Sequence, residues 1–326
     1  MEHVLVVENL RTQFDTDRGV LNALDGVSFK VRSGEIFGLA GESGCGKTMT
    51  AYSIVRLVPP PGKVTEGSVT FAGEDLLSIS ESSLRRIRGK EIALVFQEPS
   101  SALNPCFKAG DQIAETLRVH GLASSKEAAK KSIEILGQVG IPEPEKIVHF
   151  YPHQLSGGMK QRVAIAIAIV CEPRLLIADE PTTALDVTIQ AQVLSLIGKM
   201  VRRRDMSMLY ITHDLGVLRW ICNRAAVMYA GRIVEIGPVA DLISQPLHPY
   251  TIGLLRATPK MRPSEQPLET IKGNVPDLAR LPRGCKFAPR CPQVMDRCRE
   301  EEPIIFKAGE DHLVRCFLHR SAGTAG

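Results

Sequence analysis

Residues 41–48 read Gly-Glu-Ser-Gly-Cys-Gly-Lys-Thr and fit the pattern G-x-x-x-x-G-K-[ST]. Glycines at these positions let successive backbone N–H groups curl around phosphate oxygens. Lys47 would reach the outer phosphates of ATP, and Thr48 would offer its hydroxyl to Mg²⁺. An apolar run at residues 36–40 precedes the pattern, so the loop would join a buried strand to a helix N-terminus. The predicted phosphate-binding residues are Gly41, Glu42, Ser43, Gly44, Cys45, Gly46, Lys47 and Thr48.

One residue of this loop, Cys45, carries a thiol. The amides of a helix N-terminus and the charge of Lys47 would stabilise its thiolate, which predicts selective alkylation. An inert small side chain at this position remains an equally open alternative.

Two adjacent carboxylates end a second apolar run. Residues 175–178 read Leu-Leu-Ile-Ala, and Asp179 and Glu180 follow them. We expect Asp179 to hold Mg²⁺ through water and Glu180 to orient or deprotonate the attacking water. Taken alone, a strand that simply ends in charged residues explains the pair equally well. Together with the phosphate loop, the pair favours ATP hydrolysis.

A second anion site is predicted at residues 155–162, which read Leu-Ser-Gly-Gly-Met-Lys-Gln-Arg. Ser156, Gly157 and Gly158 open an apolar helix, so their amides would face an anion. One triphosphate needs only one cradle, and a second cradle makes sense if it closes over the nucleotide of a partner chain. In these residues the sequence resembles the nucleotide-binding subunits of ATP-binding cassette (ABC) transporters, whose LSGGQ signature acts in this way. The copy here reads LSGGM, with the serine and both glycines intact.

The resemblance covers residues 1 to about 255 and implies further roles. Phe14 matches the aromatic residue that stacks on adenine, although an isolated Phe is more often part of a core. Gln97, in Val-Phe-Gln-Glu-Pro, matches the glutamine that senses the metal and couples to the membrane domains. Asp186, in Ala-Leu-Asp, matches the D-loop at the dimer interface. His213, in Ile-Thr-His-Asp, matches the histidine that contacts the γ-phosphate, where a lone histidine would more often be structural.

Short apolar runs alternate with longer helical patterns, which predicts an α/β fold around a largely parallel sheet. The buried-strand candidates are residues 36–40, 93–96, 175–178 and 209–211. Residues 4–31 alternate more loosely and predict antiparallel strands. Helical patterning dominates residues 99–171. The resemblance implies that residues 1–255 form an ABC nucleotide-binding domain, with a RecA-like core, an antiparallel β subdomain and this helical subdomain.

Composition and charge limit the function classes. The 326 residues are 44% hydrophobic and 23% charged, which are ordinary globular values. A net charge of +4 is too mild to favour a nucleic-acid partner. The longest apolar run, residues 163–171, is far shorter than the ~20 residues that cross a bilayer and predicts a buried helix face. The N-terminus lacks the basic start and apolar stretch of a signal peptide, so we expect a cytosolic chain.

Architecture separates transport from the other roles of ABC ATPases. The stretch from Lys47 to Ser156 is short and free of heptads, whereas repair and chromosome proteins of this class place a long coiled coil or a large insertion there. Translation factors usually carry two cassettes, and only one is found here. Exporters commonly fuse the cassette to membrane spans, and we find no such span in this sequence. A soluble, nucleic-acid-associated ABC ATPase therefore remains only as an alternative.

Two later phrases indicate an importer. Residues 248–251 (His-Pro-Tyr-Thr) and 284–292 (Gly-Cys-Lys-Phe-Ala-Pro-Arg-Cys-Pro) resemble the C-terminal extension of the oligopeptide, dipeptide and nickel importer ATPases, most of all those of dipeptide permeases. The resemblance implies ATP hydrolysis that powers the import of di- or oligopeptides across the bacterial cytoplasmic membrane. Nickel or another small solute remains open as cargo, because substrate contacts lie on other chains.

The same resemblance implies an assembly at the cytoplasmic face of the inner membrane. The chain would be a peripheral subunit, paired with a second, paralogous ABC ATPase beneath two transmembrane permeases. An extracytoplasmic solute-binding protein would deliver the cargo. The helices of residues 99–141 would carry the groove that docks a permease, although their apolar face is also explained as ordinary core. The resemblance implies no nucleic-acid partner.

Half of the eight cysteines fall in residues 256–326, which we predict to be a small extension behind a proline-rich connector. Disulfides are disfavoured in the cytosol, and structural zinc usually draws on close C-x₂₋₄-C pairs, which this segment lacks. The longer spacings, with Pro292 after a cysteine, suit an iron–sulfur cluster. The resemblance supports a [4Fe–4S] cluster, while Zn²⁺ and unliganded thiols remain open. The four predicted ligands are Cys285, Cys291, Cys298 and Cys316.

Overall fold

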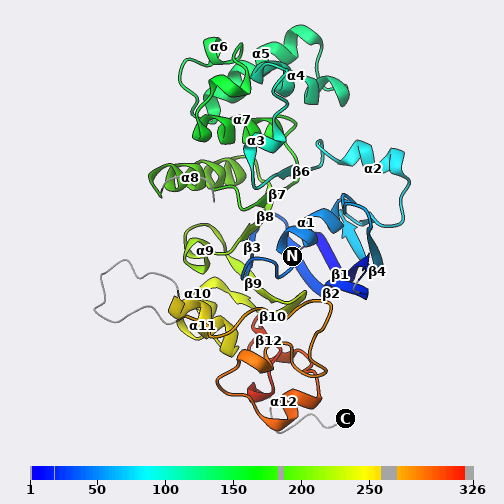
Figure 1. Cartoon of the computed structure of the whole chain (residues 1–326). Helices are drawn as coiled ribbons and strands as arrows, with labels where there is room; N and C mark the ends of the chain where they lie inside the picture. Colours follow the sequence, from blue (N-terminus) through cyan, green and yellow to red (C-terminus); the bar gives the residue numbers. More distant parts are fainter. Residues whose placement is uncertain (1, 18, 183–186, 258–269, 320–326) are drawn as a thin grey trace. The chain divides into compact units, whose positions relative to one another are not determined.

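The computed structural model describes residues 2–17, 19–182, 187–257 and 270–319 (Figure 1). The chain divides into two compact units. Unit 1 comprises Met1–Val4, Val31–Glu35 and Ser78–Tyr210, and unit 2 comprises Leu5–Lys30, Ile36–Leu77 and Ile211–Gly326. No helix in the described ranges has the length and apolar character that a membrane span requires.

Unit 1 contains most of the helices of the chain's middle part. Its elements in chain order are α2 (Glu81–Ile87), β6 (Ile92–Val95), α3 (Pro99–Ala102), α4 (Ala109–Val119), α5 (Ser125–Gln138), α6 (Pro144–Ile147), η1 (Pro152–Gln154), α7 (Gly157–Ile169), β7 (Leu175–Asp179), α8 (Val187–Arg203) and β8 (Ser207–Thr212), whose last two residues belong to unit 2. Strands β8, β7 and β6 are neighbours in that order, and β6 runs parallel to β7.

Local sequence signals explain the helices of unit 1. Ser124 and Glu127 form a capping box, each side chain bonding the other's backbone N–H, and so start α5. The apolar run predicted as a buried helix face lies largely on α7, where Val163, Ile165 and Ile169 are at most 1% exposed. Helices α3 to α7 occupy the stretch for which helical patterning was predicted. The outer domain boundary at residue 255 stays a prediction.

Unit 2 combines two sheets with short helices. Its elements are β1 (His3–Thr16), β2 (Gly19–Arg32), β3 (Ile36–Ala40), α1 (Lys47–Ile54), β4 (Gly62–Phe71), β5 (Glu74–Asp75), α9 (Leu215–Ile221), β9 (Arg224–Tyr229), β10 (Arg232–Pro238), α10 (Val239–Ser244), α11 (Pro249–Ala257), η2 (Ala288–Arg290), α12 (Asp296–Glu300), β11 (Phe306–Lys307), β12 (Leu313–Val314) and η3 (Phe317–His319), with the first residues of β1 and the last of β2 in unit 1. One sheet has the order β2-β1-β4-β5, and β4 pairs antiparallel with β1 and with β5. The antiparallel strands predicted for residues 4–31 are thus confirmed as elements β1 and β2.

The second sheet of unit 2 has the neighbours β11-β12-β10-β9-β3. Only β3 and β9 are parallel, with Leu39 opposite Ala226, whereas the pairs from β9 to β11 are antiparallel. The α/β class is therefore confirmed, but the sheet is mixed rather than largely parallel. The short turn between Tyr229 and Arg232 forces an antiparallel return.

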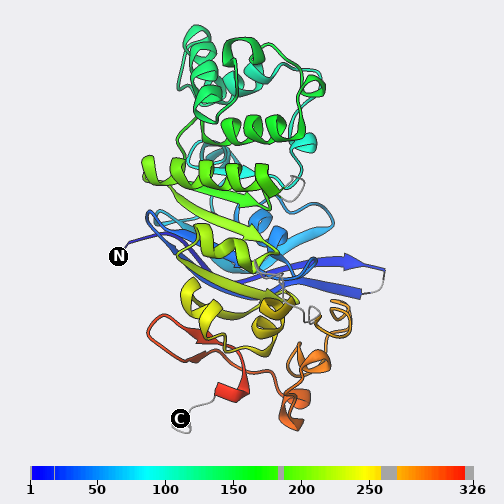
Figure 2. The same cartoon turned by 90° about the vertical axis from the view of Figure 1, so that its left-hand side faces the viewer.

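The chain's last described segment, residues 270–319, packs within unit 2. In both views it lies beside α11 (Figures 1 and 2), and β12 pairs with β10, with Glu235 opposite Val314. Val314 and Phe287 are at most 2% exposed. Sequence reasoning missed this attachment. The segment has too few apolar residues to form a core of its own, and the sequence did not show that it packs on another part of the chain. Part of the predicted connector, residues 258–269, lies outside the described ranges.

Candidate functional site

The predicted phosphate loop of unit 2 connects β3 to α1. Gly41, Gly44 and Gly46 have φ values of 155°, 77° and 108°, a region that residues with a side chain rarely adopt. A Cβ on Gly41 would collide with the carbonyl oxygen of Met228, and one on Gly46 would lie 2.8 Å from that of Ala23. The loop is therefore seated on neighbouring backbone, and only glycine fits at both points.

Lys47 is the ionised group of this loop that would meet a phosphate. Its Nζ donates to the carbonyl oxygens of Gly41 and Glu42 at 2.8 and 3.0 Å, and the residue is 5% exposed. Ser43 and Gly44 are exposed and Thr48 is half-buried, so the loop has a face open to a ligand. The Lys47 ammonium bonds to backbone carbonyl oxygens, and it can exchange these bonds for bonds to the oxygens of an incoming phosphate.

The predicted stabilised thiolate at Cys45 is wrong. The residue is fully buried, and burial raises the pKa of its thiol above the usual 9.0, against the opposing charge of Lys47 nearby. Lys47 Nζ lies 3.9 Å from Sγ. Desolvation of the thiolate outweighs the neighbouring cation. The backbone of Cys45 serves the fold instead, since its carbonyl accepts from Gly231 N at 2.8 Å.

Phe14 lies in the same unit, near the end of β1 and opposite Gly62 of β4. A Cβ at Gly62 would collide with the Phe14 ring, so the glycine makes room for it. The ring is half-buried, and part of it remains open to solvent. A partly exposed aromatic ring of this kind can take a stacked base on its face.

In unit 1, the structure brings two predicted catalytic residues together. Val95 of β6 lies opposite Ala178 of β7 in parallel register. Residues two positions further along each strand, Gln97 and Glu180, therefore end side by side, and Gln97 Nε2 donates to Glu180 Oε2 at 3.4 Å. Asp179, the last residue of β7, is 1% exposed. Its carboxylate is an oxygen donor of the kind that Mg²⁺ prefers.

The predicted second anion cradle begins α7. Ser156 is the N-cap, and its Oγ accepts from Met159 N at 3.3 Å. Ser156 and Gly157 are exposed, and no heavy atom lies within 4 Å of a Cβ built on Gly157. The departure from LSGGQ is explained locally, because the cap uses the backbone of Met159 and not its side chain.

Three predicted site residues remain. His213 follows β8 in unit 2 and is exposed, and Asp214 caps α9 by accepting from Gly216 N at 2.7 Å. Gly158 is half-buried, with Ile189 Cγ2 3.2 Å from a Cβ built on it. Asp186 lies outside the described residues.

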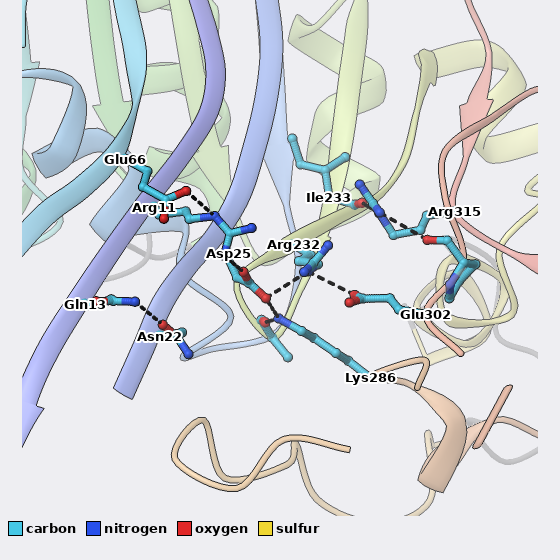
Figure 3. A network of polar contacts seen from close by, with 12 residues as sticks. Arg11, Gln13, Asn22, Asp25, Glu66, Arg232, Ile233, Lys286, Glu302 and Arg315 are labelled. Carbon is cyan, nitrogen blue, oxygen red and sulfur yellow. Dashed lines mark hydrogen bonds and ion pairs between the residues drawn. The ribbon is translucent and has the colours of Figure 1, made fainter. Parts of the chain in front are cut away.

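Sequence reasoning missed the polar groups that hold the phosphate loop. Glu42 N donates to Tyr250 Oη at 2.8 Å, and Arg290 donates to both oxygens of the Glu42 carboxylate. In the same unit, Lys286 donates to Asp25 Oδ2 at 2.7 Å (Figure 3). Tyr250, Lys286 and Arg290 lie in the phrases His-Pro-Tyr and Cys-Lys-Phe-Ala-Pro-Arg-Cys. These phrases carried a family resemblance but gave no sign of the partners of the three residues.

The four cysteines of the predicted cluster line one cavity, together with His248 and Phe287. Cys285 N donates to the carbonyl of Cys298 at 2.8 Å. Burial first, and the charges of neighbouring thiolates after it, raise the pKa of Cys285 and of Cys316 to about 11. Among the described residues, no group of three or more His, Cys, Asp and Glu side chains is arranged to hold a single metal ion.

Comparisons with known proteins agree with these motifs. The ABC transporter family model matches residues 24–183, and the model of the oligopeptide/dipeptide transporter C-terminal region matches residues 234–298. The dipeptide transport ATP-binding protein DppD of Bacillus subtilis is 48% identical, over 98% of this chain and 95% of its own length. The oligopeptide transport ATP-binding protein AppD of the same species is 47% identical, over 99% of both chains.

A solved structure shares the fold. The dimeric ATP-binding cassette MJ0796 in a post-hydrolysis state with ADP and Pi is 28% identical, with a TM-score of 0.65 over 72% of this chain and 98% of that one. The resemblance drawn from the LSGGM motif and from the phrases at residues 248–251 and 284–292 is thus confirmed. The chain is an ABC ATPase, and it belongs to the family of ABC transporter ATP-binding proteins that carry the oligopeptide/dipeptide transporter C-terminal region.

Proposed function

We propose that this ATPase powers the import of di- or oligopeptides as one of two ATPase subunits of a binding-protein-dependent ABC transporter. The observation that carries the proposal is the pairing of Gln97 with Glu180 at the ends of β6 and β7, in a chain that also has a phosphate loop and an exposed second cradle. The peptide cargo is supported by the relatives, which are named as dipeptide and oligopeptide transport ATP-binding proteins.

Each predicted site residue has a role in this proposal. Glu180 accepts the proton of the attacking water, and Gln97 and His213 orient groups around the γ-phosphate. Phe14 stacks on adenine, and the amides of residues 41–48 and Lys47 bind the phosphates. Thr48, Gln97 and Asp179 would hold Mg²⁺, which supplies charge neutralisation to the phosphates when bound.

The second cradle implies a partner. Ser156 and Gly157 are exposed on unit 1, which supports closure over the nucleotide of a second, paralogous ATPase with Asp186 at the interface. The stretch 99–141 exposes apolar side chains, Phe107 at 54% and Val119 at 73%, which support docking against a permease. Two permeases and an extracytoplasmic solute-binding protein complete the assembly, with this chain at the cytoplasmic face of the bacterial inner membrane.

Reconstitution tests the cargo and the assembly together. The complete transporter in proteoliposomes should hydrolyse ATP faster when its binding protein carries a peptide. Labelled peptide should accumulate on the side of the membrane where the ATPase subunits lie. Stimulation by a nickel chelate and not by peptide would move the assignment to the alternative cargo. Stimulation by DNA or RNA would instead favour a soluble nucleic-acid-associated ATPase.

We also propose that residues 256–326 hold a [4Fe–4S] cluster on Cys285, Cys291, Cys298 and Cys316. The proposal is supported by the single cavity that all four line. Four sulfurs around one Zn²⁺ must crowd within bonding distance of it, whereas the irons of a cubane stand apart and keep their cysteines further from one another. No single-ion site is found among the described residues, so the shared cavity alone is the structural support for the cluster. The cluster would cross-link a segment with few apolar residues.

A further inference from the structure

Glu42, the second residue of the phosphate loop, is held from three sides. Its N–H donates to Tyr250 Oη at 2.8 Å, and its carbonyl accepts from Lys47 Nζ at 3.0 Å. Its carboxylate accepts two hydrogen bonds from Arg290, at 2.7 Å from Nη1 and 3.0 Å from Nη2. The residue that touches the phosphate-binding lysine is thus fixed by a residue 248 positions further along the chain.

Arg290 is a built-in contact rather than a loose surface pair. Its side chain is only 4% exposed, against 27% for Glu42. Its remaining donors reach the carbonyls of Lys272 at 3.1 Å and Ile271 at 3.3 Å, and the guanidinium lies 5.8 Å from the centre of the Tyr229 ring. This bidentate pair, with Nε and Nη2 also bonded to carbonyls, fixes the orientation of the guanidinium against the Glu42 carboxylate.

Three aromatic rings pack residues 286–290 against the residues that hold the phosphate loop. The Phe287 ring lies 5.2 Å from that of Tyr229 and 5.4 Å from that of Tyr250, and the two tyrosine rings are 4.7 Å apart. All three residues are at most 2% exposed. Tyr250 therefore meets the segment through its ring and the loop through its hydroxyl.

A second basic residue of the same segment supports the loop from another side. Lys286 donates to Asp25 Oδ2 at 2.7 Å and to the carbonyl of Ala230 at 3.1 Å (Figure 3). The next residue, Gly231, donates its N–H to the carbonyl of Cys45 at 2.8 Å, inside the phosphate loop. Residues 286–290 therefore contact both the carboxylate of the loop and the turn beneath it.

Charge explains what Arg290 contributes. A carboxylate in a phosphate loop repels an incoming triphosphate, and in a partly buried site this repulsion is only partly screened. Lys47, Glu42 and Arg290 together carry one net positive charge, and without Arg290 they carry none. We infer that Arg290 is a positioning residue for nucleotide binding, which neutralises Glu42 and holds its carboxylate away from the phosphates. The inference rests on the nucleotide site proposed above.

Nucleotide titration of the full-length protein tests the inference. A fluorescent ATP analogue with Mg²⁺ should bind about tenfold more weakly to R290Q than to wild type, because the Glu42 carboxylate is then no longer neutralised and is free to turn toward the phosphates. R290K keeps a point charge and should fall between the two. R297Q is the matched control, because Arg297 lies in the same segment but pairs with Glu301 and not with the loop. Its affinity should equal that of wild type.

A second background separates charge from mere support. In E42Q the loop has no carboxylate to hold away from the phosphates, so adding R290Q should cost only the attraction of the lost Arg290 charge itself, a smaller factor than the loss in the wild-type background. In the assembled transporter, R290Q should raise KM for ATP by a larger factor than it lowers kcat. Equal binding by R290Q and wild type would overturn the inference, as would an equal loss in both backgrounds, because an equal loss means that Arg290 does not act through Glu42. Failure of wild type itself to bind would instead refute the nucleotide site.

Discussion

Gln97 and Glu180 are 83 residues apart in sequence and share a hydrogen bond of 3.4 Å between Nε2 and Oε2. The parallel register of β6 and β7 places them at the same sheet edge. Glu180 has a φ of 44°, a conformation that costs a residue with a side chain of order 1 kcal/mol or more and persists when the surroundings hold it. The strain lies in the backbone of Glu180, and it aims the carboxylate at the Gln97 amide, which supports the roles proposed for these two residues.

Substitution of Glu180 by Gln tests the proposed base. The amide keeps the size and the contact with Gln97 but cannot accept a proton, so turnover in the complete transporter should fall by about 10²–10⁴-fold. ATP should still bind. Glu172→Gln is the matched control, because Glu172 is an exposed carboxylate of the same unit that pairs with Arg204. Near-normal turnover of Glu180→Gln would reject the assignment.

The exposed signature cradle predicts dependence on a partner. Since Ser156 and Gly157 would complete another chain's nucleotide site, the isolated protein should hydrolyse ATP slowly. Its rate should rise when the second ATPase and the permeases are added. The measurement is phosphate release per ATPase chain before and after assembly. Full activity in a strictly monomeric preparation would contradict this prediction.

Continuous apolar runs made the buried strands predictable. β3 and β7 lie where residues 36–40 and 175–178 indicated them, and β6 is shifted by one residue from the predicted 93–96. Such runs suit strands covered on both faces, and their ends are less well determined than their existence. The phosphate-binding residues could also be predicted from the sequence, because one short motif contains both the glycines and the lysine.

Contacts between distant segments could not be predicted in this way. The Arg290–Glu42 pair joins two segments whose local patterns give no sign of each other. The attachment of β12 to β10 likewise needs no core of its own, because the apolar partners come from elsewhere in unit 2. At Cys45 the sequence displays the neighbouring cation but not the burial that outweighs it.

Burial of Cys45 predicts slow alkylation. The thiol is fully buried and burial raises its pKa, so iodoacetamide should leave it unmodified in the native protein at neutral pH. Cys106 is exposed and should be labelled under the same conditions, which makes it the internal control. Peptide mapping after labelling identifies the modified residues. Rapid labelling of native Cys45 would show that the loop opens in solution.

The four-cysteine cavity predicts a coloured protein. Anaerobically purified protein should be brown, with the broad visible absorption of an iron–sulfur cluster, and should contain iron and labile sulfide. Substitution of Cys285, Cys291, Cys298 or Cys316 by Ser should remove the colour. Cys106→Ser should not, because Cys106 does not line the cavity. Colourless protein with stoichiometric zinc would establish the zinc alternative, and protein without metal would reject both.

The buried carboxylate of Asp25 predicts a pH-dependent stability. It pairs with Arg11 at 2.8 Å, Arg232 at 2.9 Å and Lys286 at 2.7 Å (Figure 3). Burial pushes the pKa of Asp25 up, but the hydrogen bond and charge of Lys286, with the charge of Arg232, outweigh burial and leave the pKa below the usual 3.8. The ionised carboxylate therefore stabilises the fold above that pH, and this stabilisation is lost as the pH falls through the folded-state pKa.

Asp25→Asn leaves these cations without their shared carboxylate, so at neutral pH it should lower the free energy of unfolding by about 3 kcal/mol. The control Asp15→Asn removes a pair with Lys63 whose partners are 58% and 59% exposed, and should cost less than about 1 kcal/mol. Urea unfolding across a pH series measures both. The deficit of Asp25→Asn relative to wild type should shrink as the pH falls below 3.8, because wild-type Asp25 then becomes protonated as well. A deficit that stays constant or grows in acid would show that the charge of Asp25 is not what holds this network together.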